Sequence, residues 1–179
     1  MTDVAVVVLA GGEGRRIGGE KPRRELAGER LIDRALGNAR RWSDLVAVAV
    51  RDRAQVEPID AMLVADQPDV AGPLAGLISA LRFGAEVGCQ FVLTIPVDMP
   101  FLPADLLSRL RPAIGELGCA IAGSGGQRHP VCGLWRTSAL SQLQRYLAGE
   151  QRSLKAFATL IGDRQVDWPA EPVDPFFNI

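Results

Sequence analysis

Histidine and cysteine are scarce in this sequence of 179 residues, and their scarcity excludes several kinds of site. The sequence has a single histidine, His129, and a lone histidine is more often structural or surface-exposed than catalytic. The sequence shows no Ser-His-Asp arrangement. Its three cysteines, Cys89, Cys119 and Cys132, are spaced too widely for a zinc pair and are too few for a disulfide framework. We therefore expect buried thiols in a reducing compartment.

Excess charge and long apolar segments are also lacking. The 20 basic and 21 acidic residues give a net charge of −1, so no global positive field exists to attract a nucleic acid. The apolar run over residues 4–10 is shorter than a transmembrane helix and lacks the basic residues that precede a signal-peptide core. The sequence thus predicts a cytoplasmic protein with no nucleic-acid partner and no membrane contact.

What the sequence does contain is an alternation of two kinds of apolar segment. Short β-branched runs predict strands over residues 4–9, 45–50, 61–64, 91–95 and 119–122. Longer segments with helical spacing predict helices over residues 31–41, 73–85, 103–114, 138–147 and 153–161. Pro73 and Pro103 each fit the first turn of a helix, where a missing N–H costs little. Strands that are apolar throughout and separated by helices are typical of α/β proteins. We expect one domain over residues 1–179, three-layered and Rossmann-like, whose mainly parallel sheet carries helices on both faces.

A glycine-rich loop follows the first predicted strand. Residues 10–21 read Ala-Gly-Gly-Glu-Gly-Arg-Arg-Ile-Gly-Gly-Glu-Lys, and glycine N–H groups with Arg15, Arg16 and Lys21 suit a triphosphate. It is not a Walker loop, because Pro22 follows Lys21 where Ser or Thr is required. It is not a dinucleotide fingerprint either, since Ile17 stands where the third glycine would fall. The alternative interpretation is a glycine turn with solvated charges.

Two further segments carry isolated carboxylates. Asp66 opens the stretch Asp-Gln-Pro-Asp-Val-Ala-Gly-Pro-Leu-Ala-Gly, which predicts a loop and then a helix beginning at Pro73. Its carboxylate could accept hydrogen bonds from the N1–H and N2–H₂ groups of guanine, or it could be an ordinary turn residue. Asp98 follows the strand at 91–95 between two prolines, a rigid position that suits Mg²⁺. The alternative for Asp98 is a residue that caps the turn.

These segments resemble the nucleotidyltransferase superfamily. The string Leu-Ala-Gly-Gly at residues 9–12, continued by Arg16, Ile17, Gly18 and Lys21, is similar to the molybdenum cofactor guanylyltransferase branch. The Gly-Pro-Leu-Ala-Gly string at residues 72–76 and the Asp-x-Pro string at 98–100 match further motifs of that family. The resemblance implies catalytic roles for Arg16, Lys21 and Asp98, with Asp98 holding Mg²⁺ (or Mn²⁺). It implies nucleotide contacts at these residues: Leu9, Ala10, Gly11, Gly12, Lys21, Asp66, Gly72, Pro73, Leu74, Gly76 and Asp98.

The last third of the chain carries weaker matches. The His-Pro-x-x-Gly-Leu-Trp pattern at residues 129–135 resembles the family's substrate-side strand, and Gly-x-x-Arg-Ser at 149–153 resembles another of its segments. Residues 176–179 resemble the start of a Phe-x-Asn-x-Asn-Thr segment. The sequence stops before the second Asn of that segment, so the family's C-terminal end looks shortened. The implied molybdopterin contacts are Arg128, His129, Arg152, Ser153 and Asn178. Ser153 could instead be a helix cap. The pair Arg23 and Arg24, where relatives often have small or apolar residues, could extend the phosphate patch or lie in solvent.

The resemblance as a whole implies an enzyme that transfers GMP from GTP to the phosphate of molybdopterin and releases pyrophosphate. It also implies transient contacts with other cofactor-biosynthesis proteins and with recipient molybdoenzymes or their chaperones. Three alternatives stay open at this point: a cytidylyltransferase, a sugar-phosphate nucleotidyltransferase, and a non-catalytic relative that binds the nucleotide or cofactor.

Overall fold

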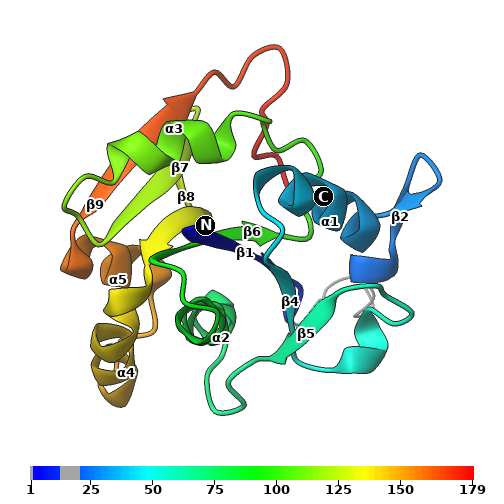
Figure 1. Cartoon of the computed structure of the whole chain (residues 1–179). Coiled ribbons are helices and arrows are strands. Elements are labelled where there is room, and N and C mark those ends of the chain that lie inside the picture. The colour runs from blue at the N-terminus through cyan, green and yellow to red at the C-terminus, as the bar shows by residue number, and fades with distance from the viewer. Residues whose placement is uncertain (1, 13–20) are drawn as a thin grey trace.

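A seven-stranded sheet runs through the middle of the protein (Figure 1). The computed structural model describes residues 2–12 and 21–179. The strands of this sheet are β1 (Val4–Leu9), β4 (Val46–Val50), β5 (Met62–Ala65), β6 (Phe91–Pro96), β7 (Cys119–Ser124), β8 (Gln127–Arg136) and β9 (Asp163–Trp168), in the order β5-β4-β1-β6-β8-β7-β9. Strand β8 is antiparallel to β6 and β7, whereas the other neighbours in the sheet are parallel.

Helices cover both faces of the sheet. Helices α1 (Leu31–Trp42) and α3 (Leu106–Ala113) lie on one face, and α2 (Pro73–Glu86), α4 (Leu140–Ala148) and α5 (Leu154–Ile161) lie on the other (Figure 1). Side chains of β1 alternate between two hydrophobic clusters, with Val6 and Val8 packed in the cluster of α1 and α3. Ala5 and Val7 pack in a cluster with α2. In the described part of the chain, every helix is too short or too polar to cross a bilayer.

The structure confirms the predicted α/β class and three-layer arrangement, with differences at the edges. The prediction that Pro103 lies in the first turn of a helix is wrong, because α3 begins at Leu106. A small hairpin of β2 (Glu25–Leu26) and β3 (Glu29–Arg30) was not expected, nor was β9 at the edge of the sheet. The described residues also form short 3-10 helices at η2 (Lys21–Arg23), η3 (Arg53–Gln55) and η4 (Thr137–Ala139). The three cysteines are buried and free, as predicted.

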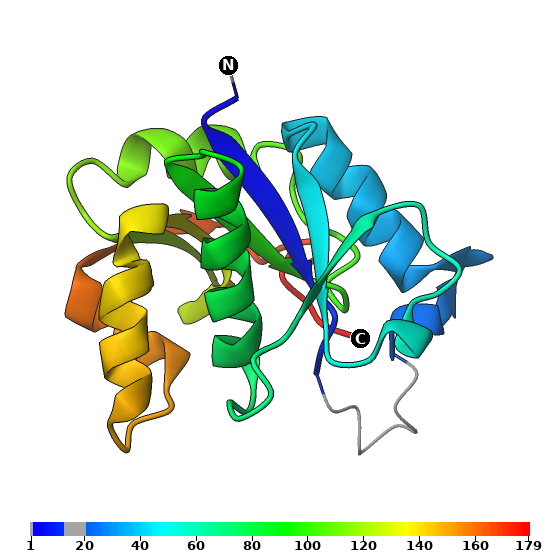
Figure 2. The ribbon, with the colours of Figure 1, turned by 60° about the horizontal axis from the view of Figure 1, so that its bottom comes forward.

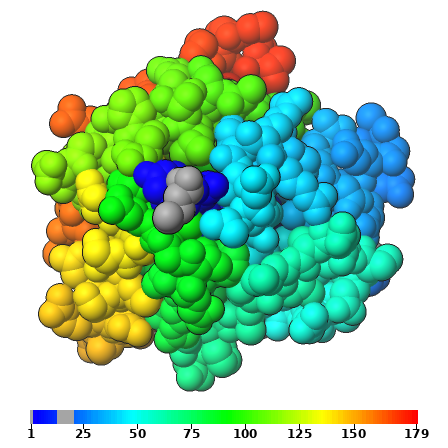
Figure 3. All heavy atoms as spheres, viewed as in Figure 1, coloured from blue at the N-terminus to red at the C-terminus, as the bar shows by residue number. Residues whose placement is uncertain are grey.

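The carboxyl ends of β5, β4, β1 and β6 lie along one edge of the sheet, because these neighbouring strands are parallel. This edge faces downward in Figure 2, where the end of the chain also lies. Figure 3 shows another face, on which the start of the chain comes to the surface. In open α/β sheets ligands bind beyond the carboxyl ends of the strands, so the downward edge in Figure 2 is the expected place for a site.

Candidate functional site

A cavity lies at this carboxyl edge, between the ends of β1, β5 and β6 and the start of α2. Its lining residues are Leu9, Ala10, Gly11, Gly12, Lys21, Asp66, Gly72, Pro73, Gly76, Pro96, Val97, Asp98, Met99, Val131 and Asn178. The structure therefore brings together nearly all residues that the sequence suggested for the nucleotide. Leu74 is the exception, because its side chain is fully buried in a hydrophobic cluster on the α2 face. Arg15 and Arg16 lie outside the described residues.

Asp98 and Lys21 form an ion pair at the carboxyl end of β6. The Nζ atom of Lys21 lies 3.0 Å from Oδ2 of Asp98. Strand β6 is buried along its whole length, and the backbone N–H of Val97 donates to the carbonyl of Leu9, which ties the loop that carries Asp98 to β1. Both side chains keep some contact with solvent, with 28% exposure for Lys21 and 16% for Asp98. An incoming anion or cation can therefore reach either partner.

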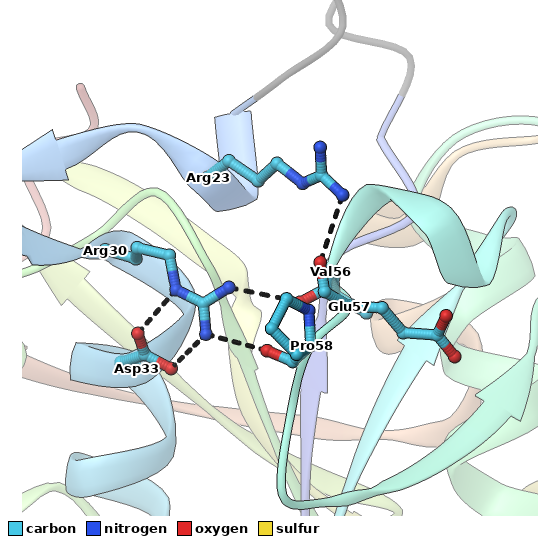
Figure 4. Close-up of polar contacts among 6 residues, drawn as sticks. All are labelled: Arg23, Arg30, Asp33, Val56, Glu57 and Pro58. Atoms are coloured by element: carbon cyan, nitrogen blue, oxygen red, sulfur yellow. Dashed lines mark hydrogen bonds and ion pairs between the residues drawn. The ribbon is translucent and has the colours of Figure 1, made fainter.

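The segment that carries Lys21 is fastened to a neighbouring loop by Arg23. One guanidinium nitrogen of Arg23 donates to the carbonyl of Ala54 at 2.6 Å and to that of Glu57 at 3.0 Å. Figure 4 shows the contact with Glu57 beside a second arginine, Arg30, which donates to the carbonyl of Pro58 on the same loop. Arg23 thus holds backbone carbonyls, whereas the sequence left open a place in the phosphate patch or in solvent. Arg24 is exposed.

Asp66 is a buried carboxylate that packs against glycine backbone. A Cβ atom at Gly11 would lie 1.6 Å from Oδ2 of Asp66, and one at Gly76 would lie 3.7 Å from Oδ1 and 2.9 Å from a methyl group of Leu9. Among the described residues, Oδ1 of Asp66 has no hydrogen-bond partner. Burial raises the pKa of the Asp66 carboxyl above its usual value, and the positive charge of Arg51 opposes this shift. A buried acceptor without a partner is costly, so it is a candidate for a ligand's hydrogen-bond donors.

The N-terminus of α2 reaches the same cavity. Gly72 has φ 69° and ψ −161°, a conformation that glycine adopts without strain, and Pro73 occupies the first helical position as predicted. Three residues of this helix start, Gly72, Pro73 and Gly76, line the cavity. Unpaired N–H groups at a helix start favour polar or anionic ligands nearby.

The residues at the carboxyl end of β6 offer one carboxylate, Asp98, to a metal ion. No group of three or more His, Cys, Asp or Glu side chains able to hold a metal occurs in residues 2–12 and 21–179. Mg²⁺ in nucleotide sites is usually held by one or two carboxylates, and phosphate oxygens and water complete its coordination. The single, partly exposed carboxylate of Asp98 fits that arrangement rather than an all-protein cage.

The residues suggested for molybdopterin are more scattered. Asn178 lines the cavity. Arg128 forms an ion pair with Asp163 at the start of β9. Arg152 donates to the carbonyls of Gly149 and Gln151, and Ser153 accepts from the N–H of Ala156 and so caps α5. Ser153 therefore fills the structural role that the sequence left open.

His129 lies in β8 and is held by neighbours from two other segments. Its Nε2 atom lies 2.8 Å from the hydroxyl of Ser124, and its ring stacks on Phe176 with 5.1 Å between centroids. Burial lowers the pKa of His129 below its usual value, partly offset by Asp174, and Lys155 lowers it further.

Some residues of the cavity were not predicted. Pro96, Val97 and Met99 flank Asp98 in sequence, so their proximity to a suspected metal ligand was the available signal. Val131 comes from β8, and only the pairing of β8 beside β6 brings it to the cavity. No local pattern in the sequence indicates that pairing.

The fold and the site together define a nucleotide-binding α/β protein. A mainly parallel sheet presents glycine backbone, a helix N-terminus and a lysine–aspartate pair at its carboxyl edge. Comparison with known proteins gives the family. The model of the MobA-like NTP transferase domain matches residues 6–165, and the chain belongs to this family.

Curated relatives and solved structures agree with this assignment. A molybdenum cofactor guanylyltransferase from Nitrobacter hamburgensis is 38% identical over 180 residues, which cover 96% of this chain and 86% of the relative. One from Rhizobium johnstonii is 38% identical over 185 residues, 98% of this chain and 87% of the relative. The structure of molybdopterin-guanine dinucleotide biosynthesis protein A from Archaeoglobus fulgidus superposes with a TM-score of 0.77 at 26% identity, covering 98% of this chain and 91% of that chain.

Proposed function

We propose that this protein is a guanylyltransferase that transfers GMP from GTP to the phosphate of molybdopterin and releases pyrophosphate. The proposal is supported by membership of the MobA-like NTP transferase family and by relatives with that activity in their names at 35–38% identity over most of the chain. The observation that carries it is the carboxylate oxygen of Asp66 at the cavity, which has no hydrogen-bond partner within residues 2–12 and 21–179.

Asp66 supplies a reason for choosing guanine. A carboxylate accepts hydrogen bonds and donates none when ionised, and guanine presents two adjacent donors, N1–H and N2–H₂, on one edge. Adenine and cytosine present an acceptor where guanine has N1–H, so either base would place that acceptor against the carboxylate. Gly11 leaves the space that this carboxylate occupies, because a Cβ there would overlap Oδ2 of Asp66.

The phosphates lie at the Lys21 and Asp98 end of the cavity in this proposal. Asp98 would hold Mg²⁺ or Mn²⁺ there, and Lys21 would contact an oxygen of the α-phosphate. When bound, the metal ion neutralises phosphate charge and orients the phosphate oxygens. The 3.0 Å contact between Lys21 and Asp98 supports this proposal, because it places the cation and the carboxylate at one point.

The chemistry needs positioning rather than a general base. An oxygen of the molybdopterin phosphate attacks the α-phosphorus of GTP, a new P–O bond forms, and the bond to the bridging oxygen of the leaving pyrophosphate breaks. A phosphate monoester is already largely ionised at pH 7, so no proton has to be removed from the attacking group. The residues of the cavity then act by holding the reactants in line and by stabilising negative charge, with Lys21 beside the α-phosphate.

Nucleotide binding by calorimetry tests the proposal, with GTP, CTP, ATP and UTP compared in the presence of Mg²⁺. We expect selective binding of GTP. Asp66→Ala should weaken GTP binding by about 10- to 100-fold, the range for hydrogen bonds to a charged group, and should leave the other three nucleotides nearly unchanged. Asp69→Ala, which removes an exposed carboxylate from the same loop, is the matched control.

Turnover separates an enzyme from a binding protein. Repeated release of pyrophosphate from GTP and molybdopterin would exclude a non-catalytic role. Selective binding of CTP would retain the mechanism but replace the product with a cytosine dinucleotide, and binding of none of the four nucleotides would contradict the proposal altogether.

A further inference from the structure

The chain after β9 returns across the molecule and ends beside the carboxyl end of β6 (Figures 1 and 2). The backbone N–H of Ile179 donates to the carbonyl of Asp98 at 2.9 Å, and the neighbouring Asn178 lines the cavity. The segment 174–179, here called the tail, therefore contacts the loop that carries the proposed metal ligand. The interactions that fix the tail therefore also maintain its contact with the Asp98 loop.

Three polar side chains fasten the start of the tail to the sheet. The hydroxyl of Ser124 at the end of β7 donates to Oδ2 of Asp174 at 3.0 Å, and it lies 2.8 Å from Nε2 of His129 on β8. The other carboxylate oxygen of Asp174 accepts from the backbone N–H of Phe176 at 2.9 Å. Ser124 is 1% exposed, so these bonds form away from competing water.

The direction of the hydrogen bonds follows from the number of protons available. A serine hydroxyl has one hydrogen, and an ionised carboxylate can only accept, so Ser124 gives its hydrogen to Asp174. The remaining contact must then be a donation from Nε2–H of His129 to the oxygen of Ser124. The order is His129 to Ser124 to Asp174, in which serine and not histidine is the central member.

This order excludes a hydrolytic triad. In such a triad a central histidine accepts the serine proton, whereas here the histidine nitrogen already carries a proton and donates it. The buried Ser124 is also hidden from any substrate carbonyl. The hydrogen bonds among His129, Ser124 and Asp174 instead attach the tail to the sheet.

Aromatic packing strengthens the same attachment. The ring of Phe176 is 2% exposed and lies between the His129 ring, with 15° between planes, and the Trp168 ring at 5.4 Å in an edge-on arrangement. Trp168 is itself fixed, because its Nε1–H donates to Asp105 at 2.8 Å. The tail is thus attached by both hydrogen bonds and a buried ring, three residues before Ile179 reaches Asp98.

We propose that His129, Ser124 and Asp174 form a clamp that holds the tail against the Asp98 loop and so positions Asn178 in the cavity. His129 is then a positioning residue that acts through the tail and not a residue that touches the substrate. The effect of the clamp on GMP transfer rests on the proposed function, but the attachment of the tail does not.

Hydrogen exchange measured by mass spectrometry tests the clamp without any substrate. Ser124→Ala removes the central hydroxyl, and His129→Phe keeps a ring for stacking but lacks the donor. In both variants the amides of residues 174–179 should exchange at least about tenfold faster, and peptides covering 96–101 should lose protection as well. Ser141→Ala, the same change at an exposed position of α4, should leave both regions unchanged.

Kinetics of GMP transfer provide the second readout. Both clamp variants should lower kcat by about tenfold with a smaller change in the KM for GTP, because misplacement of groups near the reacting atoms reduces turnover. His129→Gln, which restores an N–H donor, should recover part of the loss.

Unchanged exchange and unchanged kcat in Ser124→Ala would overturn the clamp. A raised KM for molybdopterin in His129→Phe alone would assign His129 to substrate binding instead. Absence of GMP transfer by the unmodified protein would contradict the proposed function while the exchange data still decide the clamp.

Discussion

Two regions meet at Asp98, and they differ in how their polar side chains are used. In the region formed by β1, β5 and the start of α2, one carboxylate oxygen of Asp66 has no partner in the described part of the chain, and the side chain packs against Gly11. In the region formed by β7, β8, β9 and the tail, Ser124 is hydrogen-bonded to both His129 and Asp174. Asp66 therefore keeps an acceptor for a ligand beside the cavity, whereas Ser124, His129 and Asp174 hydrogen-bond within the protein.

A sequence motif can therefore mark either a ligand site or a structural attachment, and the hydrogen-bond partners of its side chains distinguish the two. Unpaired buried acceptors are costly, so a protein retains them only where something else offsets the cost. The side chains of Ser124 and Asp174, which are hydrogen-bonded within the protein, lack this feature. Substitutions at Asp98, Gly11 and His129 test this difference.

The largest effect is expected at Asp98, where the two regions meet. Asp98→Ala removes the carboxylate that pairs with Lys21 and that we assign to the metal ion. We expect GMP transfer to fall by about 100-fold or more, since loss of an electrostatic partner at the reacting phosphate typically costs that much. The measurement is steady-state turnover with saturating GTP and Mg²⁺.

A matched control for this change is Asp44→Ala, because Asp44 is exposed just before β4, at the opposite end of the strands from the cavity. It should retain full activity. Retention of more than about a tenth of the activity by Asp98→Ala, a barrier change of only ~1.4 kcal/mol, would show that the metal is held elsewhere.

The sequence predicts the first of these regions better than the second. Strand β1 and the helix start at Pro73 follow from local rules: a run of buried β-branched residues predicts a strand, and proline favours the first helical position. Residues placed at the ends of parallel strands then meet at one edge without further information. The loop 10–21 and Asp98 could be grouped from sequence for this reason, whereas Asp66 was added from its chemistry and from the resemblance to the guanylyltransferases.

The second region depends on contacts between segments far apart in sequence. Strand β9 has the sequence Asp-Arg-Gln-Val-Asp-Trp and is half-buried at the sheet edge, so it lacks the apolar pattern that predicts a strand. The bond between Ser124 and Asp174 spans 50 positions, and no local pattern indicates it. The prediction that a helix begins at Pro103 was wrong for a related reason, since a proline also suits the turn that precedes a helix.

An intermediate effect is expected from packing in the first region. A methyl group at Gly11 would overlap the carboxylate of Asp66, whereas no atom of the described residues lies within 4 Å of one at Gly12. Gly11→Ala should lower the free energy of unfolding by about 1–3 kcal/mol, the usual cost of overpacking. Gly12→Ala should change it by no more than about 0.5 kcal/mol. Urea unfolding of the two variants tests this, and equal stabilities would mean that Asp66 moves away without cost.

The smallest effect is expected from the titration of His129 in the second region. Because burial lowers the pKa of His129 in the folded protein, the unfolded chain binds the proton more readily. The contribution of His129 to the free energy of unfolding is complete above the unfolded pKa of about 6.5 and is lost as the pH falls through the folded pKa.

Asp66 has the opposite tendency, since its raised pKa favours the folded state at low pH. The slope of stability against pH for the unmodified protein therefore mixes both groups, and only its difference from the His129→Gln variant isolates the histidine. Between pH 7 and pH 5 the unmodified protein should lose more stability than the variant, as measured by urea unfolding at each pH. Parallel curves would mean that His129 titrates as it does in water, and that the ring is less enclosed by Phe176 and Ser124 than its contacts indicate.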